Sequence, residues 1–392
     1  MASCPYCGNN PVPHFPTWFN ESSTVFMTPL NRFTFGNQLG KLFFKYVGRL
    51  FWPLFLLMEK AHMVTYRSAP SAATSSRAEV LWEEAGRRGL RMESVLFLGR
   101  ENDTYRIFIK NRPIYFSGLP RPPYMPETAE WWMDDKARVK AVLSAAGIPV
   151  SIGGSFSHFG PLLTAFRRLE KPVIIKPRLG SRGRHTTTFI YNERQLKKSF
   201  RIAKQLCYWV VLEEHLTGSV YRATMIGGKL SGILRGDPPR VTGDGIHTIR
   251  ELAALKDAAR HEKVSPVKLT GQTEQFLGRN NLRLDDILPA GRTIDLSEKI
   301  GVSYGGHSAE ETHLIHPKTM AILEKAAAAI NDPMIGFDFI IADIAGDPDM
   351  QKWGIIECNG VPFINLHHDP VEGYRNVAKD VWDFVEAHPD FY

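Results

Sequence analysis

Short apolar runs alternate with stretches of helix-forming residues along most of the chain. The apolar runs are rich in Val, Ile and aromatic residues, which predicts strands over 94–98, 105–109, 113–116, 173–176, 209–213, 221–226, 229–234, 337–344 and 353–358. The helix-forming stretches cover 78–89, 134–147, 193–205, 248–255, 274–277 and 319–330. This order of elements predicts a mixed α/β (α+β) fold.

The first 72 residues differ in character from the rest of the chain. The opening thirty are rich in Pro, Asn, Ser and Thr, which predicts an irregular arm. Further on, Lys41, Lys45 and Arg49 recur every four residues and would form one basic stripe on a helix. The apolar run that follows is shorter than the ~20 residues that cross a bilayer. We expect residues 36–58 to dock on the protein body or on another subunit of a homo-oligomer, or else to lie at a membrane surface.

The positive charge of the chain is concentrated in one window. The 392 residues carry a net charge of +7, and residues 176–250 hold fourteen Lys and Arg against five Asp and Glu. A bound polyphosphate explains this distribution as well as a nucleic acid does. Because apolar strands interrupt the window and no aromatic stacking pattern accompanies it, we rank nucleic-acid binding last. No secretory signal opens the chain, which favours a cytoplasmic location.

A Cys-x-x-Cys motif lies at the start of the chain. Cys4, Cys7 and the nearby His14 offer three potential zinc ligands. A closed structural zinc site needs four ligands, and the neighbouring sequence supplies no other. The local sequence alone therefore does not complete a metal site.

The chain lacks the two common phosphate-binding motifs, the Walker loop and G-x-G-x-x-G. A different candidate follows the strand that ends at Lys176, where residues 177–187 contain Gly180, Ser181 and Gly183. Such a loop can turn several backbone N–H groups toward phosphate oxygens, with Lys176 as a point charge on them. The alternative is a basic hairpin loop at the surface.

A second group of candidate residues lies far downstream. Asp338 lies in the strand GFDFII, and Glu357 and Asn359 lie in IIECN. Two residues apart on a strand, Glu357 and Asn359 point to the same face. Carboxylate and amide oxygens are ligands that Mg²⁺ accepts beside substrate phosphates. The alternative is a structural ion pair between a carboxylate and an arginine.

Taken in order, these motifs resemble the ATP-grasp superfamily and, within it, the ATP-grasp half of cyanophycin synthetases. The resemblance spans about residues 131–385 and includes VIIKP with its glycine loop, VVLEEHLTGSVYR, GDPPRVTGDGIHTIREL, GFDFI and IIECNGVPFINLHHDPVEG. It implies an ATP-grasp fold with two lobes enclosing the nucleotide, at 131–215 and 216–392. A small α/β domain at 73–130 and the arm at 1–72 would precede them.

The resemblance also implies contacts for the nucleotide. Lys136 and Lys176 would contact the ATP phosphates, and the loop with Gly180, Ser181 and Gly183 would close over them. The adenine edge would be held by the end of a strand, at Glu213, Glu214 and His215. Relatives place an acidic residue on the ribose hydroxyls, whereas this chain has Val220 there.

For the metal and the chemistry, the resemblance implies two Mg²⁺ ions ligated by Asp338, Glu357 and Asn359. Arg222 and Arg240 would stabilise the transferred phosphoryl group or the substrate carboxylate. His367, in a His-His pair with His368, would orient a substrate or relay a proton; the alternative is that the pair caps a turn.

These roles imply an ATP-dependent carboxylate–amine ligase that acts on an amino acid or short peptide through an acyl phosphate. The chain ends at Tyr392, without the Mur-ligase-like half of cyanophycin synthetases, so we expect one active site to perform the whole reaction. Two alternatives remain: a kinase of the same fold that phosphorylates a small metabolite, and a non-catalytic nucleotide-binding or membrane-associated module.

Overall fold

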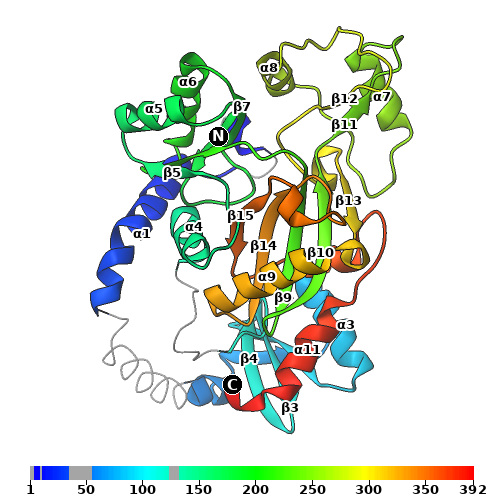
Figure 1. Ribbon diagram of the computed structural model, residues 1–392. Coiled ribbons are helices and arrows are strands. Elements are labelled where there is room, and N and C mark those ends of the chain that lie inside the picture. Colours follow the sequence, from blue (N-terminus) through cyan, green and yellow to red (C-terminus); the bar gives the residue numbers. More distant parts are fainter. Residues whose placement is uncertain (1–3, 9–10, 35–54, 123–131) are drawn as a thin grey trace.

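A computed structural model describes residues 4–8, 11–34, 55–122 and 132–392. Figure 1 shows three larger sheets, one at the bottom of the molecule, one in the middle and one at the upper left, with helices packed on each. A small two-stranded sheet with its own helices lies at the upper right. The predicted mixed α/β fold is confirmed.

The bottom sheet is antiparallel, with the strand order β1-β2-β3-β4. Its strands are β1 (Val64–Arg67), β2 (Met92–Phe97), β3 (Arg100–Ile109) and β4 (Arg112–Ser117). Two helices that are far apart in the sequence share its core, α3 (Ser76–Arg87) and α11 (Val377–Ala387). Because β1 belongs to this sheet, the sheet begins before residue 73, where the domain boundary was predicted.

The middle sheet has five antiparallel strands in the order β13-β10-β9-β14-β15. They are β13 (His307–Glu310), β10 (Lys229–Asp237), β9 (Ser219–Ile226), β14 (Met334–Ile341) and β15 (Gly354–Asn359). Their apolar side chains form a core with α9 (Pro317–Ile330) and α4 (Lys136–Ala145). Helix α4 was predicted within the lobe 131–215, yet it packs on α9 and β15 of the other lobe.

The upper left sheet has the strand order β5-β8-β6-β7. Its strands are β5 (Gly153–Phe156), β8 (Val210–Glu214), β6 (Val173–Pro177) and β7 (Thr187–Ile190). A separate core joins it to α5 (Phe159–Arg168) and α6 (Glu193–Ala203). The two predicted strands VIIK and WVVLE therefore lie next to each other as β6 and β8.

The segment between β10 and β13 forms the small unit at the upper right. It contains β11 (Arg240–Thr242), β12 (Thr293–Asp295), α7 (Ile249–Ala258) and α8 (Gly271–Arg279), which enclose their own core. The remaining short elements are η1 (Pro5–Cys7), η2 (Val302–Tyr304), η3 (Thr312–Leu314), η4 (Pro348–Met350), α10 (Asn365–His368) and η5 (Pro389–Phe391).

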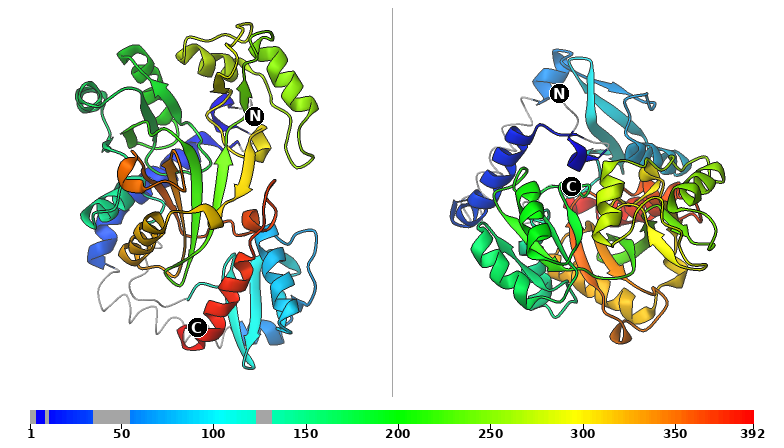
Figure 2. Two further views of the ribbon diagram at one scale, coloured as in Figure 1. Left: turned by 45° about the vertical axis from the view of Figure 1, so that its right-hand side comes forward. Right: turned by 90° about the horizontal axis from the view of Figure 1, so that it is seen from above.

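The prediction of an irregular arm is wrong from His14 onward, because α1 (His14–Thr34) is a helix of 21 residues. Figures 1 and 2 show it lying against the lobe built on β5–β8. Val25 is buried against Leu179 and Cys207 of that lobe. Docking of this kind stabilises a helix whose residues have low intrinsic propensity.

The predicted basic helix falls mostly outside the described residues, since 35–54 are not among them. Its docking on the body, on a second subunit or on a membrane therefore stays a prediction. Among the residues that the structure describes, no helix has the length and apolar character needed to span a membrane.

We predict that Trp382→Ala destabilises the protein by about 3–5 kcal/mol, because a large buried side chain leaves a cavity. Trp382 is fully buried in α11, and its Nε1–H donates to the Leu81 carbonyl oxygen at 2.9 Å. Urea unfolding measures the loss. The control is Phe391→Ala, at a residue that is 41% exposed, which should cost about 1 kcal/mol or less. Equal losses in the two variants would contradict this packing.

Candidate active site

Three charged side chains form a row across the middle sheet. The strand register pairs Arg222 of β9 with Asp338 of β14, and Asp338 with Glu357 of β15. Directly paired residues on neighbouring strands project to the same face, so the row crosses three strands on one side of the sheet. Asn359, two residues beyond Glu357 on β15, shares this face, and its Nδ2 donates to Asp338 Oδ2 at 3.3 Å.

Arg222 and Asp338 form a two-point ion pair. The guanidinium donates from Nε to Oδ1 at 2.7 Å and from Nη2 to Oδ2 at 2.8 Å. Burial lowers the pKa of Arg222, but the charge of Asp338 outweighs it, so that this pKa is raised overall. Asp338 therefore forms an ion pair with Arg222, as in the alternative to a metal site given by the sequence. Glu357 instead pairs with Lys136, whose Nζ lies 3.8 Å from Oε1.

Asp338 and Glu357 of the row, together with Asn359, offer oxygen donors for a magnesium ion. Two carboxylates and one amide suit a hard divalent cation. The Asp338 side chain is 13% exposed and that of Glu357 is 22% exposed. Both carboxylates thus keep some accessible surface while lying among neutralising charges. Asp338, Glu357 and Asn359, which sequence reasoning grouped together, are close in space.

Lys136 connects this row to the predicted phosphate loop. It is the first residue of α4, and its Nζ donates to the Gly180 carbonyl oxygen at 2.6 Å. The preceding residue, Asp135, caps the helix by accepting from two of its backbone N–H groups. The same carboxylate accepts two hydrogen bonds from Arg178, at 2.8 and 2.7 Å. The start of the loop is therefore held against the N-terminus of α4.

Lys176, the second predicted phosphate ligand, shares a buried carboxylate with another lysine. Its Nζ lies 3.1 Å from Glu213 Oε2, and the Nζ of Lys140 lies 2.5 Å from Glu213 Oε1. Ser151 Oγ also donates to Oε2, at 2.9 Å. Lys176 Nζ further donates to the Ile356 carbonyl oxygen on β15 at 3.4 Å, which brings β6 of the upper left sheet against the middle sheet.

The charges in this group shift one another's proton affinity. Burial alone would raise the pKa of Glu213, but Lys176 and Lys140 outweigh it and lower that pKa to about 2. Burial lowers the pKa of Lys140 to about 8, despite the attraction of Glu213. Sequence reasoning missed Lys140. Its position four residues after Lys136 on a predicted helix places both lysines on one face, which could have identified it.

The adenine contact predicted for Glu213 is not supported by its side chain, because Lys140 and Lys176 already pair with that carboxylate. Glu214 is also paired, with Lys352 Nζ 2.6 Å from its Oε2. The backbone N–H of Glu214 donates to the Ile152 carbonyl oxygen, and that of His215 donates to the Pro172 carbonyl oxygen. Burial lowers the pKa of His215 to about 4.

The predicted phosphate loop is exposed at its tip, at Ser181 and Gly183. Gly180 has φ = 109° and Gly183 has φ = 58°, conformations that favour glycine over other residues. Lys299 donates a hydrogen bond to the Gly183 carbonyl oxygen. The loop therefore combines glycine geometry with anchoring from two lysines, Lys136 at Gly180 and Lys299 at Gly183.

Two predicted catalytic residues are held by side chains outside the row. Arg240 begins β11 and is held between Asp237 Oδ1 at 3.1 Å and Asp295 Oδ1 at 2.6 Å. His367 is fully buried, with its Nε2 2.8 Å from Thr224 Oγ1 and its Nδ1 3.5 Å from Glu310 Oε1. The structure thus favours a structural role for His367 over a substrate contact. His368 accepts a hydrogen bond from the Ala378 N–H at the start of α11, as in the predicted turn-capping alternative.

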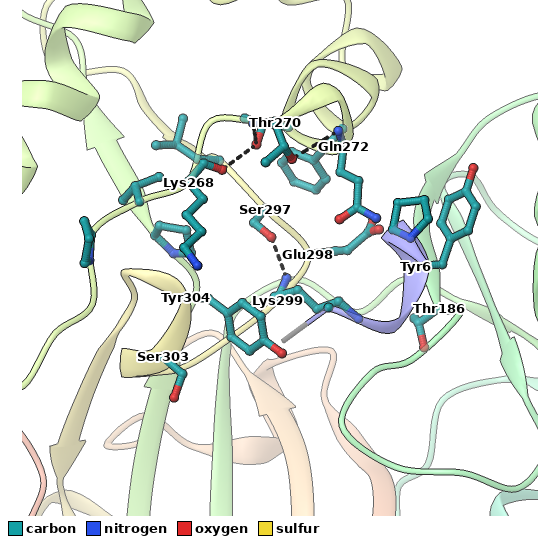
Figure 3. A pocket seen from close by; sticks show the side chains of 18 of the residues that line it. Tyr6, Thr186, Lys268, Thr270, Gln272, Ser297, Glu298, Lys299, Ser303 and Tyr304 are labelled. Carbon is teal, nitrogen blue, oxygen red and sulfur yellow. Dashed lines mark hydrogen bonds between the residues drawn. The ribbon is translucent and has the colours of Figure 1, made fainter. Parts of the chain in front are cut away.

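A cavity of about 210 Å³ lies on another side of the loop. It is bounded by η1, by Thr186 and by residues 266–276 and 296–304, as Figure 3 shows for Tyr6, Thr186 and Lys299. Its lining residues include none of the side chains of the row.

The arrangement of these sheets is the ATP-grasp fold, as predicted. A bifunctional glutathione synthetase from Pasteurella multocida has this fold, with a TM-score of 0.53 and 24% identity, over 80% of this chain and 44% of that one. No protein-family model matches the chain.

The sequence is similar to that of cyanophycin synthetases, which confirms the predicted resemblance. The cyanophycin synthetase of Crocosphaera subtropica is 31% identical over 261 residues, covering 64% of this chain and 30% of that protein. The glutathione biosynthesis bifunctional protein GshAB of Listeria innocua is 28% identical over 338 residues, covering 84% of this chain and 43% of that protein. The chain thus spans less than half the length of these relatives.

We predict that Glu213→Gln lowers the free energy of unfolding by about 3–5 kcal/mol, because it leaves two buried ammonium groups without a counter-charge. Urea unfolding at neutral pH measures the loss. The matched control is Glu170→Gln, since Glu170 pairs with Lys352 through a carboxylate that is 81% exposed. Such a surface pair contributes about 1 kcal/mol or less. Equal losses would contradict the role assigned to Glu213.

The same carboxylate predicts a pH dependence of stability. Its pKa is about 2 in the folded protein and 4.5 ordinarily, so its ionised form stabilises the fold above about pH 4.5. This contribution is lost as the pH falls from 4.5 towards 2. Thermal unfolding between these pH values should therefore show a steeper loss of stability in the wild-type protein than in Glu213→Gln. Identical slopes would refute the shift.

Proposed function

We propose that the protein is an ATP-dependent carboxylate–amine ligase that forms an amide bond through an acyl phosphate. The observation that carries the proposal is the row of Arg222, Asp338 and Glu357 across three strands, with Lys136 beside Glu357. The similarity to cyanophycin synthetase and GshAB supports it. We infer an amino acid or short peptide as the acid substrate from the same relatives.

The row suits a phosphoryl transfer. A carboxylate oxygen of the substrate would attack the γ-phosphorus of ATP while the bond from that phosphorus to the bridging oxygen breaks, releasing ADP. An amine would then attack the acyl carbon, phosphate would leave with the bonding electron pair, and the nitrogen would lose one proton to water or to the departing phosphate. Lys136 and Lys176 would bind phosphate oxygens, and Arg222 would face charge that develops on the transferred group. Glu213 would position Lys176 by holding its ammonium group.

Asp338, Glu357 and Asn359 would hold magnesium. Bound magnesium would neutralise the charge on the phosphate oxygens. We propose two ions, the number that the resemblance implies. Arg222 already binds both oxygens of Asp338, so this guanidinium would share the carboxylate with the metal. The Asn359 amide, now turned with Nδ2 toward Asp338, would offer its oxygen.

We predict that Glu357→Gln lowers ATP turnover by at least 100-fold, because it removes a charged metal ligand, while the unfolding free energy changes little. ADP release with Mg²⁺ and pooled amino acids measures turnover. Glu170→Gln, on the surface, should keep wild-type turnover. Substantial turnover in Glu357→Gln would refute the metal assignment.

A kinase of the same fold is the second candidate, because the same row would serve transfer to a hydroxyl group. Hydroxylamine distinguishes the two reactions, since it traps an acyl phosphate as a hydroxamate. A ligase should form a hydroxamate that depends on one acid in the pool. ADP together with a stable phosphorylated product and no hydroxamate would favour the kinase.

A further inference from the structure

Four potential metal ligands meet where the N-terminal segment touches the phosphate loop. Cys4, Cys7 and His14 come from the start of the chain, and His185 comes from the end of the loop. Their ligand atoms all lie within 4.8 Å of one another. The sequence offered only three ligands because the fourth lies 178 residues beyond Cys7. The fold thus adds His185 as the fourth ligand to the three that lie near one another in the sequence.

The distances between these atoms match a tetrahedral zinc site. With Zn–S bonds of about 2.3 Å and Zn–N bonds of about 2.05 Å, tetrahedral angles place S and N about 3.6 Å apart. Three such separations are 3.5 Å: from Cys4 Sγ to His185 Nε2, from Cys7 Sγ to His14 Nε2, and from Cys7 Sγ to His185 Nε2. One imidazole nitrogen thus faces two sulfur atoms at the same distance.

The surroundings of His185 orient it as a ligand. Its Nδ1 lies 2.8 Å from the Ile202 carbonyl oxygen and donates to it, so the neutral ring turns an unprotonated Nε2 toward the sulfurs. A second hydrogen bond of this kind is usual for metal-bound histidines.

The two cysteines are held on a tight turn. The Cys7 N–H donates to the Cys4 carbonyl oxygen at 3.2 Å within η1, and Gly8 follows with φ = 67°. This turn brings both sulfurs to one side. Cys7 and His185 are buried, whereas Cys4 and His14 are partly exposed. Four protein ligands in a largely buried setting are typical of a structural site.

We propose that Cys4, Cys7, His14 and His185 bind one structural Zn²⁺, which fastens the N-terminal segment to the phosphate loop. Two thiolates and two imidazoles bind zinc in preference to hard cations such as magnesium.

Other contacts near the site explain what this attachment would do. The His185 N–H donates to the Tyr6 carbonyl oxygen at 3.0 Å. At the opposite end of the loop, Leu179 packs against Val25 of α1. The N-terminal segment therefore holds both ends of the loop and leaves Gly180 to Arg184 between them. That this loop binds ATP rests on the proposed function; the metal site does not.

Metal analysis of the purified full-length chain tests the site. We expect about one zinc per chain, and the reduced, metal-free chain should take up one Co²⁺ with the absorption bands of a tetrahedral thiolate site. Cys7→Ser and His185→Gln should each lose the stoichiometric metal. The control is Cys207→Ala, at a buried thiol outside the cluster; this variant should keep the bound metal.

If the ligand variants fail to fold, the metal content and the Co²⁺ spectrum of the wild-type chain still test the proposal. A wild-type chain with no zinc and no Co²⁺ spectrum, or a Cys4–Cys7 disulfide, would overturn the proposal.

Hydrogen exchange tests the attachment to the loop. Removal of zinc by a chelator should speed exchange at least tenfold in residues 178–187 and in the N-terminal segment, with little change in the bottom sheet. Restored zinc should restore protection. Bound zinc whose removal leaves loop exchange unchanged would refute the attachment. Because neither readout depends on turnover, failure of the ligase proposal would leave the result intact.

Discussion

Two lysines approach each other in the interior of this protein because one carboxylate lies between them. Glu213 binds Lys140 of α4 and Lys176 of β6, and its own strand lies between β5 and β6. Without this counter-charge, two buried ammonium groups would repel each other and pay the full cost of desolvation. Since α4 packs on the middle sheet and β6 belongs to the upper left sheet, this carboxylate also joins the two lobes.

The row on the middle sheet depends on that junction. Lys136 and Lys140 are one turn apart on α4, so the helix that delivers Lys140 to Glu213 also delivers Lys136 to Glu357 and to the loop. Lys176 reaches the Ile356 carbonyl oxygen beside the same carboxylate. Lys176 therefore comes from the upper left sheet, whereas Lys136, on α4, and the carboxylates of the row belong with the middle sheet. An anionic ligand with a bound cation would complement both.

The sequence predicted the elements whose signal is local. The strands VIIK, WVVLE and GFDFII and the hairpin at Gly227 are present, since apolar runs and a glycine turn specify them within a few residues. The spacing of Glu357 and Asn359 likewise located one face of β15. Glu357, Asn359 and Asp338 were grouped because the motifs GFDFII and IIECN follow each other along the chain and carry oxygen ligands.

Long-range contacts were not predictable in the same way. Helix α1 depends on a docking surface near Leu179 and Cys207, which its own composition does not reveal. The burial of His367 follows from packing against Thr224 and Glu310, far from it in sequence. His185 was noted only as part of a basic loop, because its proximity to Cys4 and Cys7 exists only in the folded chain.

Calorimetric titration with a non-hydrolysable ATP analogue tests the central claim most directly, namely that lysines and carboxylates from the two lobes form one magnesium–nucleotide site. The wild-type protein should bind the analogue in the presence of Mg²⁺ and at least tenfold more weakly with a chelator. In Glu357→Gln this dependence on Mg²⁺ should largely disappear. Absence of binding by the wild-type protein, or equal binding with and without Mg²⁺, would contradict the account.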